Sequence, residues 1–375
     1  MSTAKTILAA IEKSAELIDS HHDYQRNENF NKRLDEGDIE GYELILRTPD
    51  GEQQIESISK AIFFADQPTY QQIFRVDQEQ TKYSNLWIEQ FPENEGTYDE
   101  LLGIIKRHSI VIPFIGAGFS VSAGCPSWSN YIADQARKAG INEDEVRVRI
   151  QAGEQELVMN EVIQAQTLPV FSRDFQRDFQ GPRITPSLSP CAELSGLFSG
   201  CMITTNFDDV LENCLESLGE PFREKPVGNE HSGRFVRAIY SGYNYLLKLH
   251  GGIDEQRNRV LTLEEYNAAY GEAGINYDHP IPTLLSKIFG SFSVIFMGCS
   301  LISDRYLHIL RELYDTHKEY MPKHFAILNA PTDEAERRAR DQFLASHGIS
   351  PIWFPEGEWD SPSRILKQLR FDKTG

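Results

Sequence analysis

Short apolar runs that alternate with helical stretches are the feature of this sequence that most constrains its fold. The first run, residues 109–115, is rich in β-branched residues, as expected for a strand buried on both faces of a parallel sheet. Similar runs follow at residues 201–205, 245–249, 292–297 and 324–328. Helical stretches at residues 207–218, 283–289 and 304–314 separate most of them, and another follows at 333–346. This alternation predicts an α/β fold with a doubly wound, Rossmann-like parallel sheet.

The first hundred residues do not show this alternation of apolar runs and helical stretches. Residues 1–20 have a helical spacing of apolar positions, and the polar stretch at residues 19–31 predicts a loop. Residues 42–52 predict a β-hairpin, with Pro49, Asp50 and Gly51 in its turn. We therefore expect two parts: an α+β accessory or assembly region over residues 1–100, and the α/β domain over residues 101–375.

The composition argues against several kinds of partner. Acidic residues outnumber basic ones by 56 to 37, which gives a formal net charge of −19. Sequence-independent binding to nucleic acid depends on Lys and Arg facing phosphates, so we expect no direct contact with nucleic acid. The five cysteines include no C-x-x-C pair, and no zinc site is predicted. No apolar run approaches the roughly 20 residues of a membrane span, and no signal peptide is recognisable, so we expect a cytoplasmic protein.

Glycines or polar residues follow three of the predicted strands. The first strand runs into Gly116 and Gly118, a later one into Asn206, and another into Gly298 and Ser300. Ligands of open α/β sheets bind beyond the carboxyl ends of the strands, so we expect these residues to converge on one crevice.

The glycine loop after the first strand has two interpretations. Glycines let a backbone approach a ligand closely, and the amides of such a loop attract phosphate oxygens. However, Val121 stands where the usual dinucleotide pattern has its third glycine. A strand-to-helix turn without a ligand is therefore an equally good interpretation of this loop alone.

Three further side chains are candidates for chemistry. Asn206 offers both a donor and an acceptor, and Asp208 offers an anionic acceptor. Asn206 by itself could equally serve as the N-cap of the helix predicted at residues 207–218. His250 follows an apolar strand; a lone histidine there is more often structural, but its imidazole could act as a base near neutral pH.

Taken in order along the chain, these motifs resemble those of the sirtuin superfamily. Residues 116–120 resemble the G-A-G-x-S loop of that family, residues 124–126 its G-I-P, residues 205–208 its x-N-x-D, and residues 250–251 its H-G. Residues 298–301 resemble the G-[ST]-S-L loop, and Asn329 resembles a late strand-end Asn near the adenosine ribose. The resemblance extends from about residue 100 to the C-terminus.

The resemblance implies that NAD is a substrate, with no separate cofactor and no metal. It places Asn206 and Asp208 at the nicotinamide and its ribose, and it makes His250 the general base. The implied NAD-binding residues are Gly116, Ala117, Gly118, Phe119, Ser120 and Thr205, with Gly298, Ser300 and Asn329 on the adenosine side.

Two departures from the deacylase pattern change the expected reaction. A deacylase would be expected to continue with Asp-Phe-Arg after Pro126, but Ser127-Trp128-Ser129 follows, and the four-cysteine zinc module is missing. The chain looks instead like the prokaryotic sirtuin-like proteins of antiphage defence, which cleave NAD to nicotinamide and ADP-ribose. This resemblance implies an NAD+ hydrolase of antiviral defence that forms a homo-oligomer and works beside a HerA-type ATPase. An NAD-dependent protein deacylase and a non-catalytic module that senses NAD or ADP-ribose are the alternatives.

Overall fold

The computed structural model describes residues 24, 27–35, 39, 45–48, 51–54, 57–83, 90–181, 183–198, 200–228, 232–253 and 258–374. The chain divides into two compact units, Met1–Asn85 and Leu86–Gly375. The roles expected for residues 1–100 and 101–375 stay predictions.

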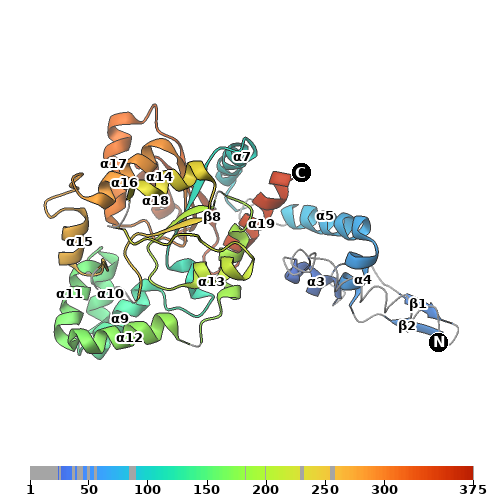
Figure 1. The fold of residues 1–375 in the computed structure, drawn as a ribbon, viewed down its shortest axis with the longest axis horizontal. Coiled ribbons are helices and arrows are strands. Elements are labelled where there is room, and N and C mark those ends of the chain that lie inside the picture. Colours follow the sequence, from blue (N-terminus) through green and yellow to red (C-terminus); the bar gives the residue numbers. More distant parts are fainter. Residues whose placement is uncertain are drawn as a thin grey trace. The chain divides into compact units, whose positions relative to one another are not determined.

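The larger unit is built around six parallel strands in the order β5-β4-β3-β6-β7-β8 (Figure 1). They are β3 (Val111–Ile115), β4 (Cys201–Thr204), β5 (Tyr245–Lys248), β6 (Ser293–Met297), β7 (His324–Asn329) and β8 (Ile349–Phe354). The chain winds outward from β3 in both directions, which confirms the predicted doubly wound α/β class. The first five strands coincide with the predicted runs. The sequence does not predict β8, because Ser350 and Pro351 interrupt its apolar run.

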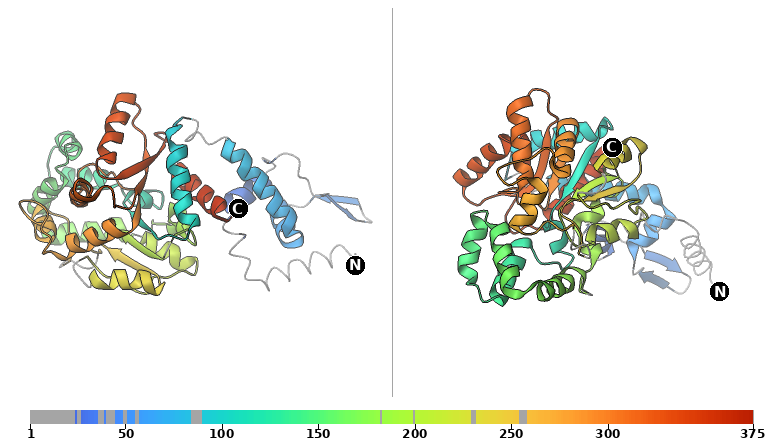
Figure 2. Two further views of the ribbon diagram at one scale, coloured as in Figure 1. Left: turned by 90° about the horizontal axis from the view of Figure 1, so that it is seen from above. Right: turned by 60° about the vertical axis from the view of Figure 1, so that its left-hand side comes forward.

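Helices cover both faces of this sheet (Figure 2). Alternate residues of β3 enter different cores: Ile112 and Phe114 pack on one face, and Val111 and Ile115 on the other. The first face is covered by α14 (Ser232–Ser241), α15 (Leu263–Tyr270), α16 (Pro280–Ser291), α17 (Arg305–His317) and α18 (Glu334–Ala345). The second is covered by α7 (Glu93–Lys106), α13 (Val210–Ser217) and α19 (Ser361–Thr374). A strand buried on both faces reads as a continuous apolar run, which is why β3 could be predicted.

A group of four helices is inserted between β3 and β4, and we call it the helical module. It consists of α9 (Trp128–Lys138), α10 (Glu143–Gln151), α11 (Gln155–Gln166) and α12 (Leu168–Gln180), drawn in green at the lower left of Figure 1. The module has its own apolar cluster, which includes Tyr131, Val158, Phe175 and Phe207. Phe207 follows β4, so this cluster joins the module to the carboxyl edge of the sheet.

The smaller unit contains α3 (Glu28–Asp35), α4 (Ile58–Ala65), α5 (Gln67–Tyr83) and the hairpin of β1 (Ile45–Thr48) and β2 (Gly51–Gln54). The predicted hairpin is confirmed in its strand pairing, although Gly51, predicted to lie in the turn, is the first residue of β2. The loop predicted at residues 19–31 is wrong at its end, because α3 begins at Glu28 and packs Phe30 and Leu34 into a core with Tyr70. The helix predicted over residues 1–20 lies outside the described residues.

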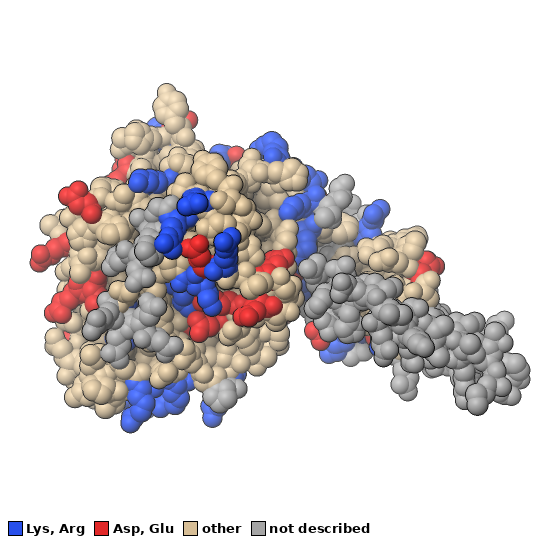
Figure 3. Space-filling view, viewed as in Figure 1, with Lys and Arg blue, Asp and Glu red and all other residues tan. Residues whose placement is uncertain are grey.

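Charges of both signs lie close together on the face of the larger unit seen in Figure 3, where Lys and Arg side chains stand beside acidic ones. Within the described part of the chain, no helix is long and apolar enough to span a bilayer.

Candidate active site

The loops that follow β3 and β6 pack against each other at the centre of the sheet. The amide of Gly116 donates to the Met297 carbonyl (2.8 Å), and the amide of Gly118 donates to the Gly298 carbonyl (2.9 Å). A Cβ on Gly116 would lie 2.5 Å from the Gly298 oxygen, and one on Gly118 would lie 2.9 Å from the Gly298 Cα. Gly298 itself has a φ of +69°, in the left-handed region. The predicted glycines are therefore brought together, and the contact between the loops needs them whether or not a ligand is bound.

The other residues predicted to bind NAD lie in different surroundings. Ala117 and Thr205 are half-buried in the segments that follow β3 and β4. Ser300 is exposed beyond the end of β6, and Asn329 is exposed as the last residue of β7. The Phe119 side chain is instead buried in the core beneath the sheet, together with Val111 and Ile115. In this conformation Phe119 can offer a ligand only its backbone.

Ser120, Asn206 and Asp208 form a buried chain of hydrogen bonds. Nδ2 of Asn206 donates to the Gly116 carbonyl and to Ser120 Oγ, both at 3.1 Å, and Ser120 Oγ donates to Asp208 Oδ1 at 2.9 Å. None of the three is more than 6% exposed. Oδ1 of Asn206 is buried and has no hydrogen-bond partner among the described residues. An unpaired buried acceptor costs about 1–3 kcal/mol, so this oxygen is the natural place for a substrate hydroxyl or a water to bind.

The alternative that Asn206 caps the following helix is wrong. That helix, α13, begins at Val210 with Asp209 in the N-cap position, and the Val210 amide donates to Asp208 Oδ1 (3.0 Å). Because the Asp208 side chain takes this amide, the segment predicted as helix from residue 207 stays non-helical until Val210. Burial raises the pKa of Asp208 above its usual value, although the hydrogen bonds from Val210 and Ser120 favour the charged form.

Lys248 binds the segment that follows β4 through hydrogen bonds from its ammonium group. Its Nζ donates to the carbonyls of Phe207 (3.4 Å) and Asp208 (2.8 Å), to Asp209 Oδ1 (2.9 Å) and to Glu212 Oε1 (2.7 Å). Burial disfavours the charged ammonium, but the carboxylates of Glu212 and Asp209 outweigh it and the pKa of Lys248 lies above its usual value. A charged lysine at the end of β5 therefore fixes the backbone next to Asn206, a role that the sequence does not reveal.

His250 follows β5, which neighbours the strand that precedes Asn206, and its side chain contacts two tyrosines. The Leu249 amide donates to the Thr204 carbonyl (2.8 Å), which ties the ends of β5 and β4 together. Nε2 of His250 lies 2.9 Å from the Tyr270 hydroxyl, and Nδ1 lies 3.4 Å from that of Tyr266. The side chain is only 4% exposed, and burial lowers its pKa to about 3. The imidazole is therefore neutral near pH 7.

The two tyrosines lie one turn apart on α15, and the sequence contains a signal for that helix. Thr262 and Glu265 form a capping box at its start, a pattern that can be recognised as T-x-x-E. Arg305 then lies over the Tyr266 ring (5.6 Å) and donates to Glu156 Oε2 (2.6 Å), which connects α15 to α17 and α11. That these tyrosines reach His250 follows from tertiary packing and could not be predicted.

A buried carboxyl group near the β6 loop is another residue that the sequence does not reveal. Asp304 lies at the start of α17, and its Oδ2 has no hydrogen-bond partner in the part of the chain that the structure describes. Burial raises the pKa of Asp304 to about 6. In the same described ranges, no three His, Cys, Asp or Glu side chains are grouped so that they could hold a metal ion.

A comparison with protein-family models gives a match over the part of the chain that contains most of the site residues described above. Residues 200–352 match the model of the SIR2-like domain. The match supports a sirtuin-like protein and NAD-related chemistry in general. No curated protein matches the chain. The SIR2-like match runs from the start of β4 into β8 and includes Asn206, His250 and Gly298; the Gly116 loop lies before it.

The contact between the glycine loops predicts a loss of stability when Gly116 gains a methyl group. We expect Gly116→Ala to lower the free energy of unfolding by about 1–3 kcal/mol, because the facing backbone must move. Gly96→Ala is the matched control, since Gly96 lies in α7 with no atom within 4 Å of the added Cβ. That change should stabilise the protein by about 0.5–1 kcal/mol. Equal changes in the free energy of unfolding for Gly116→Ala and Gly96→Ala, measured by denaturant titration, would show that the contact between the loops is not tight.

The raised pKa of Asp304 predicts a pH-dependent effect of Asp304→Asn. Because the pKa is about 6 in the folded chain against 3.8 as the ordinary value, ionisation of this group costs stability. The cost is absent below about pH 4 and complete above about pH 6. Asp304→Asn should therefore stabilise the protein at pH 7.5, by roughly 3 kcal/mol at most, and not at pH 4. The exposed Asp315 on the same helix provides the control, Asp315→Asn; a destabilised Asp304→Asn at pH 7.5 would contradict this account.

Proposed function

We propose that the chain is an NAD+ hydrolase that cleaves the bond between nicotinamide and ribose. The observation that carries this proposal is the buried Ser120–Asn206–Asp208 chain of hydrogen bonds, in which Asn206 Oδ1 has no partner among the described residues. The chain lies beside the topological switch point, where the strand order of the sheet reverses between β3 and β6. Doubly wound sheets bind dinucleotides at that point. The SIR2-like match gives independent support for NAD as the ligand class.

In the proposed reaction the C1′–N bond of NAD+ breaks and its electron pair stays with the nicotinamide ring, which leaves as a neutral molecule. Positive charge develops on the ribose, and water adds to C1′ and releases a proton. Asn206 Oδ1 accepts a hydrogen bond from this water or from a ribose hydroxyl. Asp208 stabilises the cationic ribose or binds the carboxamide, since a preorganised anion in a buried site acts strongly on developing charge.

His250 is the proposed acceptor of the released proton. A pKa of about 3 is far below the value near ambient pH at which a general base works best. Burial is the cause of this low value, so substrate binding must bring polar groups or water to the imidazole before it can take a proton efficiently. The Tyr270 and Tyr266 hydroxyls hold the ring in place until then.

Substitutions at the two central residues test the proposal. His250→Ala and Asn206→Ala should each lower NAD turnover, by about 10²–10⁴-fold for the histidine, while the chain stays folded. His308→Ala is the matched control, because His308 is exposed on α17. The measurement is nicotinamide release from NAD, with products identified by mass spectrometry. Full activity in either site variant would exclude the role given to that residue, and release that requires an acyl-lysine peptide would favour the deacylase alternative.

On the resemblance to antiphage proteins, we further propose that this activity depletes NAD in antiviral defence. Such a hydrolase must stay silent until needed, and assembly as a homo-oligomer with a HerA-type ATPase would supply that control. The separate unit Met1–Asn85 contributes none of the site residues named above, and we propose that it makes these contacts.

This proposal predicts that the chain and the ATPase form one complex with changed NAD turnover. The measurement is size-exclusion chromatography of the chain alone and with the ATPase, followed by nicotinamide release from the same fractions. A chain that lacks residues 1–85 serves as a comparison for the assembly surface. Separate elution together with unchanged turnover would refute control by this partner.

A further inference from the structure

A buried arginine in contact with the helical module has no charged partner among the residues that the structure describes. Arg259 is 5% exposed, and within the described ranges of the chain it makes no hydrogen bond and no ion pair. Its guanidinium lies over the rings of Phe171 and Phe175, each at 5.5 Å. Stacking uses the face of a guanidinium and leaves its N–H donors, which lie in its plane, unused. Burial lowers the pKa of Arg259 from its usual value, but an arginine stays charged in proteins.

A second unpaired polar group lies near this arginine. Among the described residues the buried hydroxyl of Tyr131 has no hydrogen-bond partner, and it interacts electrostatically with Arg259. Its ring packs against the same Phe171 and Phe175 rings, at 6.4 and 5.7 Å. Buried polar groups are paired in the great majority of cases, so two neighbouring unpaired donors point to a missing ligand.

Among the described residues, the acidic groups that act on Arg259 or Tyr131 are engaged elsewhere. Glu265 acts on Arg259 only at a distance, because its Oε2 accepts the amides of Leu261 (2.8 Å) and Thr262 (2.9 Å). Asp174 and Asp178 on α12 pair with Arg177 instead, at 3.1 and 2.9 Å. No carboxylate of the described chain therefore neutralises Arg259.

We propose that Arg259 and Tyr131 form a binding site for a phosphate-type oxyanion in the helical module. A planar guanidinium and a phenol, each with a donor that has no partner among the described residues, present donors and positive charge, the combination that recognises phosphate oxygens. An unpaired buried charge is costly, and a bound oxyanion removes that cost.

The position of Arg259 connects this site to the candidate active site. The Val260 amide donates to the His250 carbonyl (2.9 Å), and Phe175, which stacks on Arg259, also packs 5.1 Å from Phe207. The oxyanion is therefore either a phosphate of the dinucleotide itself or a separate small phosphate ligand. The anion site does not depend on the proposed hydrolysis, which is tested separately by nicotinamide release.

Thermal unfolding of the full chain with inorganic pyrophosphate tests the site. Pyrophosphate should raise the Tm of the unmodified chain. In Arg259→Met, the pyrophosphate concentration needed for the same rise in Tm should be at least about tenfold higher. Arg173→Met is the matched control, because Arg173 lies on α12 with 74% of its side chain exposed, and it should keep the response. Without ligand, Arg259→Met should be as stable as the unmodified chain or more so, since an unpaired buried charge is removed. A purely structural arginine would give the opposite result, a lower Tm without ligand.

Milder variants keep the test valid if Arg259→Met does not fold. Arg259→Lys retains the charge but not the planar fork, and Tyr131→Phe removes only the hydroxyl; each should weaken the pyrophosphate response several-fold. An unchanged response in both variants would overturn the proposal.

NAD, added in the Asn206→Ala background that is expected to lower turnover, distinguishes the two sources of the phosphate. If NAD abolishes the pyrophosphate response, the site holds a phosphate of the dinucleotide; if the two Tm increases add, it holds a separate ligand. Absence of any pyrophosphate response, together with equal NAD affinity with and without Arg259→Met, would refute the site.

Discussion

The backbone contact between Gly116 and Gly298 is the constraint on which the rest of the site depends. It joins the two strands from which the sheet winds in opposite directions, β3 and β6, at their carboxyl ends. The carbonyl of Gly116 is also an acceptor for Asn206 Nδ2, so the same loop positions the first group of the buried Ser120–Asn206–Asp208 chain. The site is thus attached to the two central strands of the sheet, while helices distant in the sequence surround it.

Three buried charges near this centre differ in how they are compensated. Lys248 is paired with Glu212 and Asp209 and also holds two carbonyls of the Asn206 loop, so its charge serves the architecture. Asp304 and Arg259 have unpaired atoms, and burial shifts the pKa of each toward the neutral form. Removing two charges from water is favourable only with good pairing. The paired charge therefore stabilises the loop, whereas the unpaired atoms of Asp304 and Arg259 cost stability in the described chain.

The sequence predicts those parts of the structure that depend on local pattern. Strands β3 to β7 are continuous apolar runs, and the carboxyl ends of parallel strands meet at one edge, so the approach of Gly116, Asn206 and Gly298 could be expected. Neither the Ser120–Asp208 hydrogen bond nor the enclosure of His250 by Tyr266 and Tyr270 has such a local signal. They arise because helices distant in the sequence pack beside the strand ends, and apolar spacing does not specify which residues then meet. The same holds for the helical module, whose packing against the strand ends has no local signal in the sequence.

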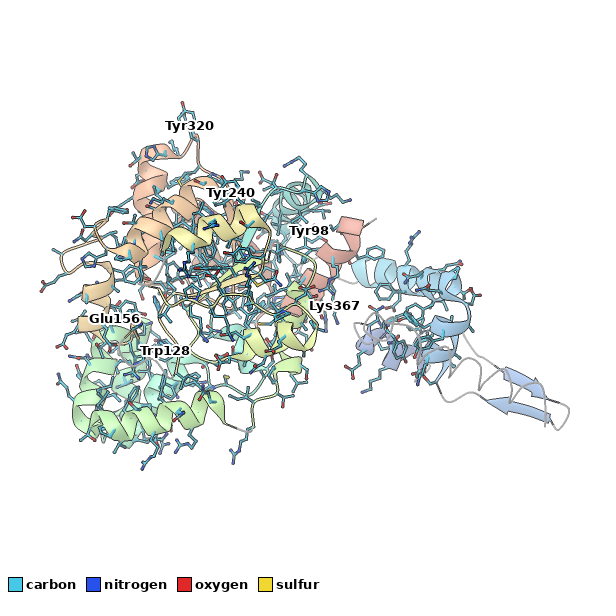
Figure 4. The ribbon with its side chains drawn as sticks, viewed as in Figure 1. Tyr98, Trp128, Glu156, Tyr240, Tyr320 and Lys367 are labelled. Atoms are coloured by element: carbon cyan, nitrogen blue, oxygen red, sulfur yellow. The ribbon has the colours of Figure 1, made fainter. Side chains whose placement is uncertain are left out.

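The burial of His250 sets a condition on any reaction at this site. A histidine that is 4% exposed cannot contact a ribose unless a neighbouring element moves. The elements around it are connected through Arg305, which donates to Glu156 of α11, to Asn267 of α15 and to the Gly271 carbonyl (Figure 4 labels Glu156). Movement of α15 would separate Tyr266 and Tyr270 from the imidazole, admit water and raise the pKa of His250 toward its ordinary value, because burial alone holds it low. With His250 in its proposed role as the base, opening of the site and activation of that base would be the same event.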